Sequence, residues 1–197
     1  MNMKAINEHM IYIRDAQAQD FKAAAPLIVQ AMEDLARFFT QSDDLVQAIT
    51  LFEHFFQQQH NQYSFEHTLI CEIENEIVGT LSAYDGALLS DLRAPFLQFI
   101  EEKYHLKNFF PADETQAGEY YIDTISVSPK FQGMRIGTKL LEASMEKAKH
   151  LKHKKMGLLV DVNNPNAERL YTRLGFQPVG FKEFMGGTYQ HMQFKIG

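Results

Sequence analysis

The 197-residue chain has one cysteine and no recognisable metal-binding motif. Cys71, in the apolar stretch HTLICEI, cannot form an intrachain disulfide framework. It could be a nucleophile, but we expect a buried strand thiol, since free cysteine is often interior. The eight histidines lack metal-ligand spacing, and neither HExxH nor CxxC occurs. We therefore predict no metal site.

Long apolar runs and an excess of positive charge are also missing. No run approaches the roughly 20 apolar residues that span a bilayer, so no membrane partner is expected. The opening MNMKAINEHM lacks the apolar core of a signal peptide, which predicts a cytoplasmic protein. The net charge of −6 argues against nucleic acid as a partner. We interpret the basic run KAKHLKHKK, residues 147–155, as a solvated helix end.

The arrangement of apolar segments predicts one α/β domain, residues 1–197, without repeats or linkers. DFKAAAPLIVQAMEDLARFF, residues 20–39, is expected to form one helix containing Pro26 or starting near it. EYYIDTISV, residues 119–127, reads as a central strand, and a helix is expected from Gln132. In NNPNAERLYTRLGF, Asn164 suits a helix cap and Gly175 the position after its end.

The loop FQGMRIG lies between that strand and that helix. A helix start exposes about four backbone N–H groups without helical partners, and their dipoles favour an anion. Gly133 would let a ligand approach the backbone closely. The loop is neither a Walker A motif nor GxGxxG. From these residues alone, a phosphate site and a plain strand–helix turn remain equal alternatives.

FQGMRIG together with NPNAERLYTRLGF resembles two motifs of the GNAT N-acetyltransferase superfamily. The second motif matches without gaps at Asn164, Ala167, Leu170, Tyr171, Gly175 and Phe176. Arg135 departs from the first motif, because the family usually has its middle glycine there. The resemblance implies acetyl-CoA as acyl donor, with its pyrophosphate at Gln132, Gly133, Met134, Arg135, Ile136, Gly137 and Thr138.

The fold implied by the resemblance is a mixed, mostly antiparallel sheet of six to seven strands, flanked by helices. The opening YIRDAQAQDF also looks like the family's first strand and helix. Residues 86–118 exceed the short connection usual in the family. We interpret them as an extra helical segment before the cofactor-binding strand, and as a candidate lid on the acceptor side.

The resemblance also implies roles for individual residues. Main-chain groups of Ile125, Ser126 and Val127 would bind pantetheine, although without it they would simply be strand core. Tyr171 would protonate the departing thiolate, or else be a packed tyrosine. Asn164 would cap its helix, contact the cofactor, or both.

Two carboxylates are candidates for the general base. Glu119 and Asp123 are expected to alternate onto one strand face with Tyr121 and Ile125, leading toward the thioester. Each could equally be a structural carboxylate. A base whose pKa is raised by burial would suit the task.

The acceptor is expected to meet the segment 85–118. Its acidic side chains suit a cationic amine, but a solvated helix would carry the same charges: Asp91, Glu101, Glu102, Asp113 and Glu114. The predicted function is direct acetyl transfer to a primary amine on a small molecule or peptide. The alternative is a non-catalytic acyl-CoA-binding or regulatory domain. A homodimer is an open alternative to a monomer.

Overall fold

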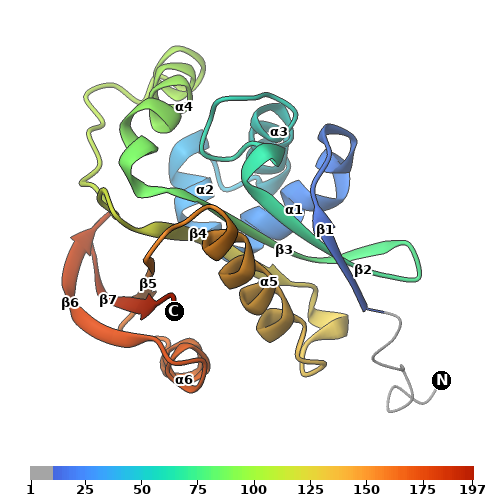
Figure 1. Cartoon of the computed structure of the whole chain (residues 1–197). Coiled ribbons are helices and arrows are strands. Elements are labelled where there is room, and N and C mark those ends of the chain that lie inside the picture. The colour runs from blue at the N-terminus through green and yellow to red at the C-terminus, as the bar shows by residue number, and fades with distance from the viewer. Residues whose placement is uncertain (1–10) are drawn as a thin grey trace.

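A single seven-stranded sheet runs through the computed structural model, which describes residues 11–197 (Figure 1). The strand order is β1-β2-β3-β4-β5-β7-β6, and every neighbouring pair is antiparallel except β4 and β5. This confirms the predicted mixed, mostly antiparallel sheet. The strands are β1 Ile11–Asp15, β2 Thr68–Ile73, β3 Glu76–Asp85, β4 Tyr120–Val127, β5 Lys155–Asp161, β6 Gln177–Phe184 and β7 Gly187–Lys195.

Helices cover both faces of the sheet (Figure 1). One core joins α5 to β2–β5 and β7 through residues such as Ile122 and Leu140, and another joins the helices α1–α4 to Ile70 of β2. The helices are α1 Phe21–Ala31, α2 Glu33–Thr40, α3 Leu45–Phe56, α4 Leu89–Tyr104, α5 Ile136–His150 and α6 Pro165–Arg173. Among the described residues, no helix is long and apolar enough to cross a membrane.

A bulge in β4 changes which side chains share a face. Ser82 pairs with Thr124 and Ala83 pairs with Ile122, so Asp123 has no partner opposite it on β3. The extra residue interrupts the alternation of the strand. Beyond it, Ser126 accepts a hydrogen bond from Gln30 of α1, whereas Ile125 packs in the core beneath α5. The expected shared face of Asp123 and Ile125 is therefore wrong.

The first predicted helix is in fact two helices. Residues 20–39 break at Met32, whose φ of −142° and ψ of 43° are not helical. No proline or glycine marks this break, and Pro26 lies inside α1. The helix expected from Gln132 instead begins at Ile136. The residues in between form the loop that faces the site.

Residues 86–118 form the expected extra helical segment, α4, followed by an irregular stretch. Arg93 of α4 fixes that stretch by an ion pair with Glu114 and by a hydrogen bond to the Pro111 carbonyl at 3.4 Å. Whether this segment closes over a substrate stays a prediction, as does the single-domain assignment.

Candidate active site

Strands β4 and β5 separate in the middle of the sheet. They pair from Tyr120 and Met156 to Ile122 and Leu158, after which β4 continues to Val127 beside β3 alone. A cleft of about 1210 Å³ lies at this separation. Both strands line it, together with α2, α4, the start of α5 and α6. Main-chain groups on the β5 side of β4 are consequently left without strand partners.

The loop before α5 carries a row of unused backbone donors. The first backbone hydrogen bond into the helix comes from the N–H of Lys139 to the carbonyl of Arg135, at 3.0 Å. Within residues 11–197, no N–H from Gly133 to Thr138 donates to another backbone carbonyl. The donors lie at the positive end of a 15-residue helix, where an anion binds favourably. Arg135 and Arg173 add positive charge to the cleft lining.

Two residues in this loop have left-handed backbone conformations. Gly133 has a φ of 81°, which glycine adopts without steric cost. Arg135 has a φ of 62° at the cap position of α5, a conformation that disfavours a side chain with Cβ. This backbone conformation explains why glycine would suit the position where the sequence has arginine.

Gly137 lies in the first turn of α5 and faces the cleft. A Cβ built on it would lie 4.0 Å from Leu170 Cδ2 and 4.0 Å from Val127 Cγ2, at the limit of ordinary contact. The fold therefore has room for a larger residue here.

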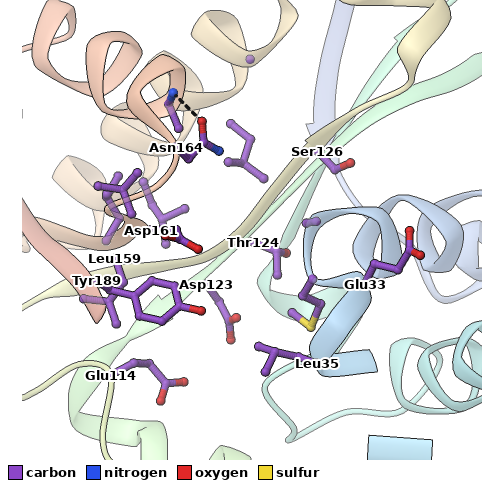
Figure 2. Close-up of a pocket in the computed structure, with 18 of the residues that line it drawn as sticks. Glu33, Leu35, Glu114, Asp123, Thr124, Ser126, Leu159, Asp161, Asn164 and Tyr189 are labelled. Carbon is purple, nitrogen blue, oxygen red and sulfur yellow. Dashed lines mark hydrogen bonds between the residues drawn. The ribbon is translucent and has the colours of Figure 1, made fainter. Parts of the chain in front are cut away.

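Helix α6 places Asn164 and Tyr171 on the other wall of the cleft. The side chain of Asn164 accepts a hydrogen bond from the N–H of Ala167 at 3.1 Å, which confirms the predicted cap (Figure 2). Gly175 follows the helix with a φ of 96°, as expected for its C-terminal end. Tyr171 packs against Phe176, and burial raises its pKa to about 12. Its hydroxyl is therefore protonated at neutral pH and able to donate.

Asp123, the bulge residue, presents its carboxylate to the cleft. Its Oδ2 accepts hydrogen bonds from the Tyr84 hydroxyl at 2.8 Å and from Gln62 Nε2 at 3.4 Å. Burial, followed by the nearby charge of Glu114, raises the pKa of Asp123 to about 7. At this value the carboxylate can take up a proton near neutral pH.

Glu119, the other candidate base, lies outside the cleft lining. It is 1% exposed and precedes β4. Thr115 donates to it at 3.0 Å, Gln193 also donates, and His191 Nε2 lies 3.0 Å from its Oε1. Burial raises the pKa of Glu119, but these partners outweigh burial and lower it below its usual value. Its environment is that of a structural carboxylate.

The end of the cleft beside Asp123, where the sequence analysis expects the acceptor, combines acidic and aromatic side chains. Figure 2 shows Glu114, Asp123 and Tyr189 facing a common space, with Glu33 and Leu35 of α2 on its other side. Buried Glu114 forms an ion pair with Arg93, whereas Asp34 lies exposed at the rim. Of the other acidic residues in the 85–118 segment, Asp91, Glu101, Glu102 and Asp113 are exposed and absent from the lining.

The cleft brings together most of the residues that the sequence singled out. Met134 instead packs against the core beneath α5, and Glu119 lies beyond the cleft. The remaining residues line it: Asp123, Ile125, Ser126, Val127, Gln132, Gly133, Arg135, Ile136, Gly137, Thr138, Asn164 and Tyr171. Sequence reasoning missed Gln62 and Tyr84, because neither belongs to a motif. Within residues 11–197, no cluster of three or more metal-ligating side chains occurs.

Comparison with known proteins agrees with this geometry. The model of the acetyltransferase (GNAT) family matches residues 29–176. A curated relative, the spermine/spermidine N(1)-acetyltransferase of Bacillus subtilis (strain 168), is 33% identical over 75 residues. The match covers 38% of this chain and 49% of the relative, so the chain spans about half the length of that protein.

Two solved structures superpose over nearly the whole chain. A crystal structure described as an acetyltransferase has a TM-score of 0.80 and 31% identity, covering 94% of this chain and all of that one. An N-acetyltransferase from Staphylococcus aureus Mu50 has a TM-score of 0.80 and 26% identity, covering 93% of this chain and all of that one. The resemblance in the two motifs is thereby confirmed, and the chain belongs to the acetyltransferase (GNAT) family.

Proposed function

We propose that the chain is an acetyl-CoA-dependent N-acetyltransferase that transfers an acetyl group directly to a primary amine. The observation that carries the proposal is the Asp123 carboxyl, with a pKa of about 7, beside the separation of β4 and β5. Family membership supports acetyl-CoA as the donor, since GNAT proteins generally use it. The unused N–H groups from Gly133 to Thr138 would bind its pyrophosphate.

The chain's own residues would perform three tasks. Main-chain groups of β4 beyond Ile122, on the side that β5 no longer pairs, would hold the pantetheine arm and polarise the thioester carbonyl. Asp123 would accept a proton from the neutral amine as its nitrogen bonds to the carbonyl carbon and the carbon–sulfur bond breaks. The hydroxyl of Tyr171 would donate to the departing sulfur.

The charge at the acceptor end favours a cationic amine. Glu33 and Asp34 occupy the rim, and Asp123 lies inside. The curated relative is named for acting on spermine and spermidine. We therefore propose polyamines as the first acceptors to test, beside simple amines and a peptide with a free N-terminus.

The competing function is a non-catalytic acyl-CoA-binding or regulatory domain. The raised pKa of Asp123 favours the enzyme, because a buried carboxyl with a pKa of about 7 in a cleft is typical of a general base. Release of CoA from acetyl-CoA with an amine panel separates the two functions. Acetyl-CoA binding by calorimetry without amine-dependent CoA release from any acceptor would support the regulatory domain. The Asp123→Asn variant serves as the inactive control.

A further inference from the structure

Gln62 lies beside the Asp123 carboxylate with one half of its amide unused. Its side chain is buried, with the residue 4% exposed, and it lines the cleft. Nε2 donates to Asp123 Oδ2, whereas Oε1 has no hydrogen-bond partner in the part of the chain that the structure describes. A buried amide carbonyl without a partner is unfavourable, so this atom is suited to a donor from a ligand.

The loop that carries Gln62 is held on both sides. The N–H of Gln62 donates to the carbonyl of Leu92 at 3.0 Å. The preceding Asn61 donates from its side chain to the carbonyls of Phe55 and Gln58, at 3.0 Å each. An ionised carboxylate only accepts hydrogen bonds, so the half of the Gln62 amide that faces Asp123 Oδ2 is Nε2, and Oε1 is left for another donor. The free carbonyl of Gln62 is thus fixed in orientation.

The two oxygens of the Asp123 carboxylate also differ in their hydrogen bonds. Oδ2 accepts both protein hydrogen bonds, from Tyr84 and from Gln62. Oδ1 has no hydrogen-bond partner among residues 11–197, and it is not one of the buried atoms that lack a partner. Two acceptors, Asp123 Oδ1 and Gln62 Oε1, therefore remain without hydrogen-bond partners on neighbouring side chains that both line the cleft.

We propose that Gln62 and Asp123 form an amine seat that selects primary over secondary amines, an inference that rests on the proposed function. A neutral primary amine has two N–H bonds and one lone pair. One N–H is directed to Asp123 Oδ1, the other to Gln62 Oε1, and the lone pair to the thioester carbon.

The step balances with these two acceptors. The nitrogen–carbon bond forms, the carbon–sulfur bond breaks with its electron pair leaving on the CoA sulfur as a thiolate, and Asp123 Oδ1 receives one proton. The second N–H remains on the product amide, where Gln62 Oε1 holds it. A secondary amine has one N–H, so its reaction at Asp123 leaves Gln62 without a donor.

The test compares primary amines with their N-methyl counterparts. The probes are 1,4-diaminobutane, 1-aminobutane and 2-phenylethylamine, each with its N-methyl form, measured as CoA release under kcat/KM conditions. We expect the Gln62→Met variant to reduce the wild-type preference for the primary amine by about 10- to 100-fold, because one hydrogen bond in a buried site is lost. The KM for acetyl-CoA should change less than twofold.

Gln30→Met is the matched control, because the Gln30 amide bonds to Ser126 and Val127 farther along β4. We expect it to keep the preference for primary amines. A second variant, Gln62→Glu, retains an acceptor oxygen and should keep this preference as well. The added carboxylate beside Asp123, and the loss of the Gln62 Nε2 donor, should raise the pKa of Asp123. The fall of kcat/KM at low pH, the acidic limb of the profile, should therefore move to higher pH.

The outcomes separate the inference from the proposed function. Wild-type protein that acetylates no amine overturns both. Turnover with an unchanged primary-to-secondary ratio in a folded Gln62→Met variant overturns the amine seat alone. If Gln62→Met does not fold, loss of the preference in Gln62→Glu, or an unmoved acidic limb, overturns it instead.

Discussion

Replacing Asp123 by asparagine should remove catalysis and at the same time stabilise the fold. The carboxyl has a pKa of about 7, raised from 3.8, because burial and the charge of Glu114 disfavour its ionised form. Asparagine has nearly the same shape, carries no charge and still offers an oxygen to Tyr84. The substitution therefore removes mainly the cost of ionising this group in the folded chain.

The size of the effect follows from proton linkage. The folded chain holds the Asp123 proton more tightly than the unfolded chain, so protonation favours folding. Ionisation of Asp123 therefore lowers the free energy of unfolding of the wild type relative to Asp123→Asn. This loss is absent below pH 4, grows between pH 4 and pH 7, and is constant above pH 7. Raising the pKa from 3.8 to about 7 corresponds to a loss of about 4 kcal/mol in the free energy of unfolding at pH 8. Between pH 5 and pH 8 the difference should grow by about 2 to 3 kcal/mol.

The assay is urea unfolding of wild type and Asp123→Asn across this pH range. At pH 8 the variant should be the more stable, with a thermal midpoint higher by about 5 to 15 °C. A difference that stays constant with pH, or a less stable variant at pH 8, would refute the assignment of the raised pKa to Asp123.

The same variant should lose about 10²- to 10⁴-fold in kcat/KM if Asp123 is the general base. The wild-type profile of kcat/KM should fall below pH 7, and this acidic limb should vanish in the variant. An acceptor amine with a pKa above 9 keeps its own titration separate.

Glu119→Gln is the matched control, since it neutralises the other candidate base. The pKa of Glu119 is lowered in the folded chain, so its contribution to stability is present above the unfolded pKa and lost as the pH falls through the folded value. The variant should therefore be destabilised at pH 8, opposite in sign to Asp123→Asn, and retain the acidic limb. Loss of the limb in Glu119→Gln but not in Asp123→Asn would exchange the two roles.

Five further variants, at four positions, test the proposed cofactor site and the support of the proposed base. Gly137→Glu should abolish acetyl-CoA binding in calorimetry, whereas Gly137→Ala should stay folded, because a Cβ there has no neighbour closer than 4.0 Å. Arg135→Gly should raise the unfolding free energy by about 1 kcal/mol by relieving the positive φ, and weaken acetyl-CoA binding slightly at low salt only. Tyr171→Phe should keep acetyl-CoA affinity and lose about 10²-fold in kcat; full turnover would make the residue a core tyrosine. Tyr84→Phe should move the acidic limb of kcat/KM to higher pH, since its hydroxyl lowers the pKa of Asp123.

The sequence predicts best where one local signal determines one local structure. Asn164 before Pro165 and Gly175 after the last turn set both ends of α6, and capping does not depend on distant packing. The break at Met32 carries no such signal, because its residues have helical propensity. The two helices pack on different elements, α1 on α3, β3 and β4 and α2 on α3 and α4, and this tertiary packing overrides that propensity.

The sequence predicts the loop before α5 better than the surroundings of Asp123, for a related reason. The donor loop consists of consecutive residues, so its spacing is visible in the chain. Asp123 depends on Gln62 and Tyr84, which lie 61 and 39 positions away and meet it only in the folded sheet. The choice between Glu119 and Asp123 could not be made without knowing these partners.

The bulge in β4 connects the failures of sequence reasoning to the chemistry of the site. Regular alternation would have placed Asp123 with Ile125, on the face packed beneath α5. There, a carboxylate would have lain in an apolar core. One extra residue turns Asp123 to the Tyr84 face, where two donors hold Oδ2 and leave Oδ1 open. Bulges are frequent beside active sites. The bulge that makes the prediction from regular strand alternation wrong is therefore also the feature that positions the proposed base.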